Sequence, residues 1–156
     1  MKISVQEGLE LKRKLQSLVI KELRDSIAAL QKNISELRES AESEGKSSAG
    51  DKYETGRAMI QLEIEKVAQQ LQEKETGLGV ISNLQLDIQE AVRRGGLVFT
   101  SEGNYFLAIS AGSVSVDGQN ISCISPTSPL GQLLLGKKTG DRIVIRDREF
   151  LIKNIV

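Results

Sequence analysis

Apolar residues recur every three or four positions along the first part of the chain. The repeat runs without an interrupting Gly or Pro through Ile20, Leu23, Ile27, Leu30, Ile34, Leu37 and Ala41. This strict alternation of spacings predicts an α-helix with the narrow seam of a coiled coil. A second apolar stripe at Leu11, Leu15 and Leu18 places the start of the helix between Val5 and Leu9. About 36 helical residues would extend for roughly 54 Å, so this helix needs a partner.

A matching stripe follows later in the same chain, with the polar Lys74 at one seam position. It runs through Tyr53, Arg57, Ile60, Ile64, Val67, Leu71, Leu78 and Ile81. Between the two stripes, the segment 43-SEGKSSAGD-51 is rich in Gly and Ser, as a chain reversal should be. We therefore predict a long antiparallel helical hairpin, an arm over residues 1–84 with its tip at about 43–56. The alternative is that either helix pairs with a second copy of the chain.

The pattern changes after Leu84. Residues 85–96 are predicted to be a helix remnant or a connector. Short alternating segments then predict strands joined by turns in an antiparallel sheet, at 97–100, 105–110, 113–116, 120–125, 142–145 and 149–155. One short helix interrupts them, with Ser128 as its N-cap, Pro129 at its first position and Gly136 at its end.

Residues 97–156 are thus expected to form a small domain, and the whole chain to be an α+β protein. The aromatic residues of this domain are expected in its core, and they are Phe99, Tyr105, Phe106 and Phe150. Cys123 is expected to be a buried apolar residue on a strand.

Composition excludes several kinds of function. Lys plus Arg number 21 and Asp plus Glu number 21, so a net charge of zero gives no bulk attraction to nucleic acid or to an anionic membrane. The absence of His excludes Ser-His-Asp and Cys-His catalysis, and one Cys cannot form a zinc cluster. The N-terminus lacks the apolar core of a signal peptide, and no segment approaches the ~18 apolar residues of a membrane span. With a lone Cys that suits a reducing compartment, we expect a soluble cytoplasmic protein.

Carboxylates are concentrated at the expected tip. Asp51 and Glu54 are three residues apart, which would place both on one face of the first turn of the second helix. Over residues 39–54, two Lys and five acidic residues give 2 − 5 = −3. The five acids are Glu39, Glu42, Glu44, Asp51 and Glu54, and the lysines are Lys46 and Lys52. The simpler alternative is structural, because an N-cap Asp with a Glu three residues later forms a capping box.

The segment 126-PTSPLGQLLLGKKTGDRIVI-145 carries a resemblance to a known family. Its elements in order are Ser128-Pro129, Leu135-Gly136-Lys137 and Gly140-Asp141. This order resembles the C-terminal domain of the Gre (GreA/GreB) transcript cleavage factors, which are transcription elongation factors of bacterial RNA polymerase. The tip, 50-GDKYE-54, is similar to the Gre tip in having Gly-Asp, two residues and then Glu. The resemblance therefore covers nearly the whole chain.

The resemblance implies a helical hairpin followed by a domain like that of the FK506-binding proteins (FKBP-like). It implies that the hairpin enters the secondary channel of RNA polymerase, where Asp51 and Glu54 assist in holding the second magnesium ion during cleavage of backtracked RNA. Carboxylate oxygens suit Mg²⁺, and a second metal generates the nucleophilic water. The protein would then have no catalytic residues or tightly bound cofactor of its own, and would stimulate the nuclease activity of the polymerase. Its partners would be RNA polymerase and the 3′ end of nascent RNA or DNA in the elongation complex, with no membrane and no small-molecule substrate.

The tip departs from the family pattern, because Tyr53 falls between the two acids and Thr55-Gly56 follows them. One alternative is a regulator that binds the secondary channel without stimulating cleavage, and another is a coiled-coil adaptor unrelated to transcription. Six basic residues of the first helix form either a stripe for RNA and the channel wall or a salt-bridged, solvated face. They are Lys12, Arg13, Lys14, Lys21, Arg24 and Lys32. Three Phe and two Tyr are too few for the aromatic pocket of a prolyl isomerase.

Overall fold

The computed structural model describes residues 3–47 and 51–156, and the side chains of residues 44–53 lie outside the described part. The chain divides into two compact units. We call Met1–Ile20 with Val80–Val156 the sheet unit, and Lys21–Gly79 the hairpin unit. This division groups the first 20 residues with the sheet, whereas the predicted arm over 1–84, connector over 85–96 and domain over 97–156 follow the order of the chain. Those boundaries remain a prediction.

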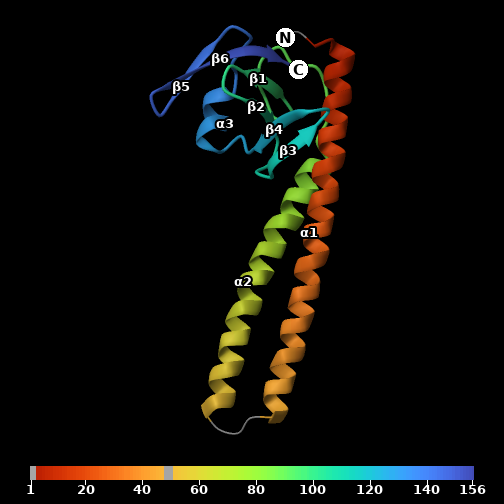
Figure 1. The fold of residues 1–156 in the computed structure, drawn as a ribbon, viewed down its shortest axis with the longest axis vertical. Coiled ribbons are helices and arrows are strands. Elements are labelled where there is room, and N and C mark those ends of the chain that lie inside the picture. The colour runs from red at the N-terminus through yellow and green to blue at the C-terminus, as the bar shows by residue number, and fades with distance from the viewer. Residues whose placement is uncertain (1–2, 48–50) are drawn as a thin grey trace. The chain divides into compact units, whose positions relative to one another are not determined.

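The fold is α+β, as predicted. Two long helices, α1 (Val5–Ser47) and α2 (Asp51–Ser82), precede six strands and a short third helix (Figure 1). The strands are β1 (Leu97–Thr100), β2 (Asn104–Leu107), β3 (Gly112–Val116), β4 (Gln119–Ile124), β5 (Arg142–Ile145) and β6 (Arg148–Ile155). The short helix α3 (Pro129–Leu134) lies between β4 and β5 in the sequence.

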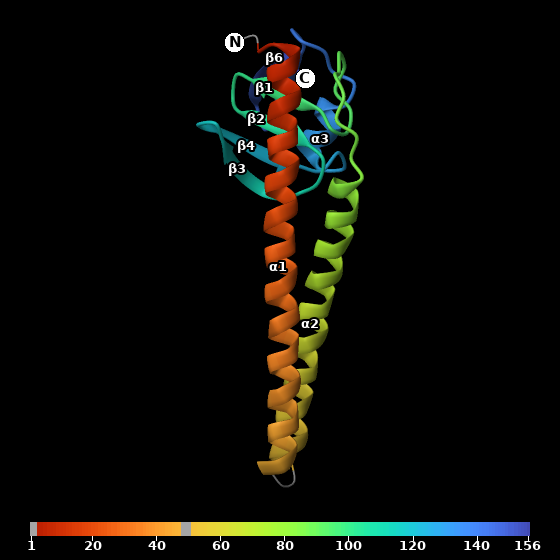
Figure 2. The same cartoon turned by 90° about the vertical axis from the view of Figure 1, so that its right-hand side faces the viewer.

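In the hairpin unit, α1 and α2 run antiparallel and lie side by side in two perpendicular views (Figures 1 and 2). Burial follows the predicted seam. Leu23, Ile34 and Val67 are buried, and the neighbouring seam residues Ile27, Leu30, Leu37 and Ala41 are partly buried. Most other described side chains of this unit are exposed, as expected when two helices share one narrow apolar stripe. The prediction of a hairpin within one chain is confirmed.

Helix α1 begins at Val5, within the predicted range, and its start is capped. The Ser4 backbone N–H donates to Glu7 Oε2 at 2.8 Å, and the Glu7 N–H donates to Ser4 Oγ at 3.2 Å. This reciprocal pair is a capping box, which satisfies two backbone donors of the first turn. Hydrogen bonds from the Ser4 backbone and side chain to the Glu7 carboxylate lower the pKa of Glu7 because they stabilise its charged form.

The sheet is mixed, with strand order β3-β4-β2-β1-β6-β5. The prediction of an antiparallel sheet is wrong at one place, since β2 and β4 pair in parallel, from Asn104 opposite Ile121 to Leu107 opposite Ile124. Strand β4 lies between β2 and β3 in the sheet. It runs antiparallel to β3 and in the same direction as β2. The remaining neighbours are antiparallel.

Two tight turns close the outer hairpins of the sheet. Asp117 and Gly118 have φ values of 50° and 76° between β3 and β4, and Arg146 and Asp147 have φ values of 50° and 62° between β5 and β6. Positive φ at both central residues is the geometry of the type I′ turn, whose twist matches that of the flanking strands. The sequence predicts turns at 117–119 and 147–148, so the first prediction is met and the second turn lies one residue earlier than predicted.

Both faces of the sheet are covered. One face carries a core cluster that includes Val98, Leu107, Leu134 of α3, Ile143 and Ile152. On the opposite face, Leu97 and Phe106 lie opposite each other on β1 and β2 and are fully buried. Phe106, Phe150 and Cys123 are buried as expected, and Tyr105 packs against the core cluster. Phe99 differs from the prediction, because it is only partly buried and lines a cavity.

Residues 83–96 form an irregular connector without a helix, which decides between the two predicted forms. The connector is anchored by backbone hydrogen bonds to the rest of the sheet unit. The Val92 N–H donates to Lys137 O at 2.9 Å, and the Gly136 N–H donates to Val92 O at 2.8 Å. These bonds join the connector to the chain that leaves α3.

The short helix α3 has the predicted ends. The Gly131 N–H donates to Ser128 Oγ at 3.0 Å, Pro129 is the first helical residue, and Gly136 beyond the helix has a φ of +79°. The Gly140-Asp141 turn follows, in which the Lys138 N–H donates to Asp141 Oδ2 at 2.7 Å. Gly140 has a φ of +93°, a conformation that favours glycine. In the part of the chain that the structure describes, no helix is long and apolar enough to cross a membrane.

Candidate functional site

The predicted site lies at the turn between the two long helices. Helix α1 ends at Ser47 and α2 begins at Asp51, so Asp51 opens the second helix as the sequence predicts. Glu54 falls in the first turn of α2 and its side chain is exposed. The side chains of Asp51 and Tyr53 lie outside the described part, as do residues 48–50. The pairing of the Asp51 and Glu54 carboxylates therefore remains a prediction.

Around the tip, the described acidic side chains are exposed. Glu39 and Glu42 lie near the end of α1, and both are exposed as Glu54 is. The side chains of Glu44, Lys46 and Lys52, which complete the predicted local charge of −3, lie outside the described part. Within the described residues, no group of three or more His, Cys, Asp or Glu is arranged to hold a metal ion. That Glu54 offers a hard oxygen ligand to a metal held by another molecule remains a prediction.

Of the six basic residues predicted on α1, three form ion pairs, two are exposed and one is buried. Lys14 pairs with Asp117 at 3.0 Å, Lys21 with Asp25 at 3.4 Å, and Lys32 with Glu36 at 4.0 Å. Arg13 and Arg24 are exposed. Exposed pairs of this kind contribute ~0.5 kcal/mol or less each. The solvated face is therefore the better of the two predicted alternatives for these residues.

Lys12 is the buried residue of the six, with 0% of its surface exposed. Its Nζ donates to the backbone carbonyl of Asp87 at 2.8 Å. Burial lowers the pKa of Lys12 to about 8, while the Asp87 carboxylate opposes this shift and Arg93 adds to it. The prediction that Lys12 belongs to an exposed stripe is wrong. Its spacing from Gly8 and Leu15 is helical, so Lys12 falls on the face of α1 that packs into the sheet unit.

Gln16 lies one turn after Lys12 on α1 and also hydrogen-bonds to the chain that joins α2 to the sheet. Its Nε2 donates to the carbonyls of Ile81 at 2.8 Å and Leu84 at 3.1 Å. Ile81 lies in the last turn of α2, whose carbonyls have no partner within the helix. Lys12 and Gln16 thus bind three backbone carbonyls between residues 81 and 87. Arg93 pairs with the Asp87 side chain in the same connector and lowers the pKa of Asp87.

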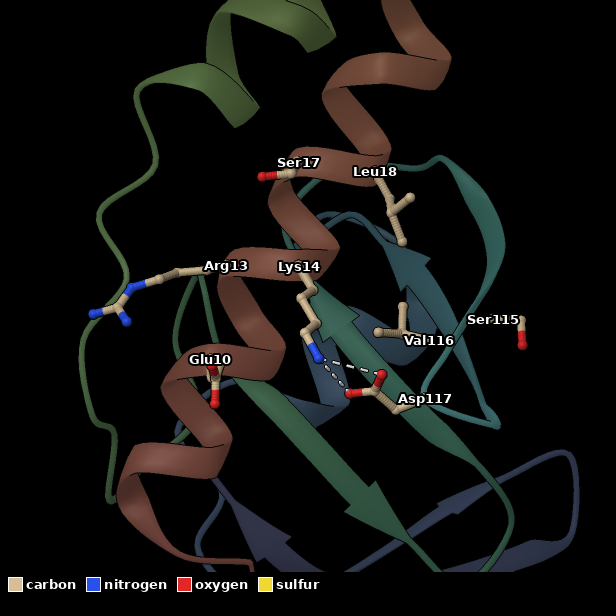
Figure 3. A pocket seen from close by; sticks show the side chains of 8 residues that line it. All are labelled: Glu10, Arg13, Lys14, Ser17, Leu18, Ser115, Val116 and Asp117. Atoms are coloured by element: carbon tan, nitrogen blue, oxygen red, sulfur yellow. Dashed lines mark hydrogen bonds and ion pairs between the residues drawn. The ribbon is translucent and has the colours of Figure 1, made fainter.

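An open depression of about 530 Å³ lies beside the N-terminal part of α1 in the sheet unit. It is lined by Glu10, Arg13, Lys14, Ser17 and Leu18 of α1 and by Ser115, Val116 and Asp117. Figure 3 shows Lys14 reaching the Asp117 carboxylate, while Arg13 points away from this pair. The hydrogen bond from Lys14 to Asp117 raises the pKa of Lys14, so the Lys14 ammonium stays protonated at neutral pH. The Lys14 ammonium and the Asp117 carboxylate are therefore already paired with each other in this depression.

Among the comparisons with known proteins, only the comparison with solved structures gives a match. No protein-family model matches the chain, and no curated protein sequence matches it. Two solved structures that match are described as "GreA factor homolog 1 (Gfh1) protein of Thermus thermophilus" and "the transcription factor Gfh1". The first is 19% identical with a TM-score of 0.35, and covers 88% of this chain and 94% of the other. The second is 20% identical with a TM-score of 0.35, and the match covers 87% of this chain and 92% of the other. A likeness at this level does not assign a function.

Proposed function

We propose that this chain is a Gre-like transcription factor that binds bacterial RNA polymerase and inserts the tip of its helical hairpin into the secondary channel. The proposal rests on one combination of observations. Two long paired helices meet at a turn that carries an exposed carboxylate, and the same chain carries the Gre-like C-terminal motif. This proposed function implies that the protein works in the cytoplasm, where the polymerase is found.

The C-terminal motif has a structural role at each of its elements, which supports its use as a family signature. Ser128 caps α3, Gly136 adopts a positive φ after the helix, and Asp141 accepts the Lys138 N–H in the turn before β5. Substitution at any of these positions would remove a cap, require a strained backbone or leave a donor unpaired. The resemblance therefore involves residues that this fold requires.

At the tip, Asp51 and Glu54 would contribute carboxylate oxygens to the second magnesium ion of the polymerase. That ion belongs to the polymerase and, when bound, would polarise the phosphate and generate the attacking water. The two residues would orient and complete the ion's ligand shell. The protein by itself would then catalyse no reaction, and would stimulate cleavage by its partner near the 3′ end of the RNA.

Halted elongation complexes with backtracked RNA provide the test. Wild-type protein is expected to release 3′ RNA fragments, and Asp51→Ala and Glu54→Ala should each slow this release by at least about tenfold, because each removes a metal ligand. Glu63→Ala serves as the matched control, since Glu63 is an exposed acid of α2 outside the tip. Equal cleavage by all variants would refute the site assignment. If the wild type binds polymerase but releases no fragments, the cleavage function is wrong.

A second function, secondary-channel binding without cleavage, is favoured by the tip sequence. Lys52 and Tyr53 separate the two acids, and Gly56 follows within the second turn of α2. A helical Gly costs about 1 kcal/mol relative to Ala, which would loosen the start of α2 and the placement of Glu54. In the same assay this function predicts that the protein inhibits intrinsic cleavage, and that Asp51→Ala and Glu54→Ala leave the inhibition intact.

A further inference from the structure

A cavity of about 290 Å³ lies on the sheet unit where β1 turns into β2. Its lining residues come from the N-terminal segment and four strands, and they are Ile3, Phe99, Thr100, Asn104, Gln119 and Lys153. Phe99 of β1 lies opposite Asn104 on β2 and opposite Asn154 on β6. An aromatic side chain is thus flanked by amide side chains on both neighbouring strands.

The lining combines one aromatic ring, amides and one cation. Phe99 is partly exposed, unlike the buried Phe106 and Phe150. Lys153 is exposed and has no ion-pair partner among the residues that the structure describes. Thr100 is already occupied, because its Oγ1 donates to Gly103 O at 2.8 Å and accepts N–H groups of the β1–β2 turn. The groups that remain available to bind a ligand are therefore the Phe99 ring, the side-chain amides and the Lys153 ammonium.

One residue that lines this cavity carries an unsatisfied buried polar atom, and a second such atom belongs to a residue paired with Phe99 across the sheet. Across the described side chains, two buried polar atoms lack a hydrogen-bond partner, Gln119 Oε1 and Asn154 Nδ2. Gln119 lines the cavity, and Asn154 lies opposite the Phe99 that lines it. Buried polar atoms are nearly always paired, so these two exceptions need a physical cause. Rotation about its last torsion lets the Gln119 amide present either its oxygen or its nitrogen to a bound group.

We propose that this cavity binds a nucleotide, with the base against Phe99 and the phosphate at Lys153. Bases stack on aromatic side chains, and an Asn or Gln amide supplies the donor and acceptor that match the edge of adenine. Lys153 supplies the charge that a phosphate needs. A neutral sugar would leave Lys153 unused, and an aliphatic anion would leave the amides unpaired. The volume is at the small end for ligand cavities, which fits one nucleotide and excludes a large ligand.

Isothermal titration calorimetry with AMP as the probe tests this site on the full chain without polymerase. Phe99→Leu is expected to weaken AMP binding by at least about tenfold, since it removes the stacking surface. Lys153→Ala should weaken the binding of AMP and leave that of adenosine unchanged. Lys138→Ala is the matched control, because Lys138 is an exposed lysine outside the cavity, and it should change neither.

Asn104→Ala provides a second variant that leaves the aromatic ring in place. It should weaken AMP binding and reduce the preference for AMP over CMP, while the exposed Asn120→Ala on β4 should do neither. Far-UV circular dichroism establishes that each variant is folded. The proposal is overturned if millimolar AMP does not bind, or if inorganic phosphate binds as tightly as AMP and Asn104→Ala has no effect. The latter result would mean an anion bound to Lys153 only.

Discussion

One helix passes through two environments in this molecule. Within residues 5–20 of α1, Leu11, Lys12, Leu15 and Val19 are buried in the sheet unit. In the described side chains from Lys21 onward, α1 buries only Leu23 and Ile34. The comparison shows that the same secondary structure can be held by a closed core or by a narrow seam. The hairpin unit keeps most of its surface available for a partner, and its stability depends on few side chains.

The difference between the units is tested most strongly by matched leucine truncations. Leu15→Ala removes a fully buried side chain of the sheet unit and should lower the free energy of unfolding by about 2–5 kcal/mol, because it leaves a cavity. Leu37→Ala removes a partly buried seam residue and should cost only about 1 kcal/mol. Urea unfolding followed by far-UV circular dichroism measures both. Equal losses would mean that the two environments do not differ as described.

Lys12 makes the stability of the sheet unit depend on pH. Its folded pKa of about 8 lies below its ordinary value of 10.5, so the folded state releases the proton first. The free energy of unfolding should therefore rise as pH increases from about 8 to about 10.5, by up to about 3 kcal/mol. The measurement is urea unfolding across this pH range. Lys12→Met cannot titrate, so the same rise in Lys12→Met would refute the assignment.

Two glycine substitutions should have opposite signs in the two units. At Gly8, an added Cβ would clash with Cγ1 and lie 3.0 Å from Cβ of the buried Val156, so Gly8→Ala should destabilise by about 1–3 kcal/mol. At Gly79 of α2, an added Cβ meets nothing within 4 Å, so Gly79→Ala should stabilise by up to about 1 kcal/mol. Thermal unfolding of the pair measures the difference. Stabilisation by Gly8→Ala would show that α1 does not pack against Val156.

The smallest effect is expected from the ion pairs on α1. Asp25→Asn removes the partner of Lys21, and both side chains are largely exposed, at 71% and 75%. The change should therefore cost no more than about 0.5 kcal/mol, and the loss should disappear at high salt. Urea unfolding at low and high salt measures it. A loss above 1 kcal/mol that persists at high salt would indicate a contact beyond this pair.

Periodicity predicted most of the fold because it records which side chains face an apolar neighbour. The three-four spacing from Ile20 to Ala41 predicted the seam, and alternating segments predicted all six strands, five of them with ends within one residue and β2 with an end three residues too late. Local chemistry predicted both ends of α3, since Ser128 and Gly136 act through their immediate neighbours.

Features that depend on distant parts of the chain were not predictable in this way. Alternation reveals the faces of a strand and carries no information about its direction, so the parallel pairing of β2 with β4 was missed. Residue type indicated that Lys12 is exposed, while only its helical spacing from Gly8 and Leu15 indicated burial. The cavity beside Phe99 arises from four strands that meet in the folded sheet.

For the candidate site, the sequence predicted where α2 begins and that Glu54 lies in its first turn. The relative placement of the Asp51 and Glu54 carboxylates depends on side chains beyond the described part. Two carboxylates that bind one metal and two residues that form a capping box can both be three residues apart, as Asp51 and Glu54 are. Local sequence therefore cannot separate them, and only a measurement in the complex can.

Photo-crosslinking from Glu54 tests the central claim most directly. Benzoylphenylalanine replaces Glu54 in one protein and the exposed Glu22 of α1 in a control, and each is irradiated in a halted elongation complex. We expect the probe at position 54 to crosslink to the polymerase segment that holds the catalytic magnesium or to the RNA 3′ end, and the probe at position 22 to reach neither. If position 54 crosslinks only to the outer surface of the polymerase, or to nothing, the hairpin tip does not reach the active centre.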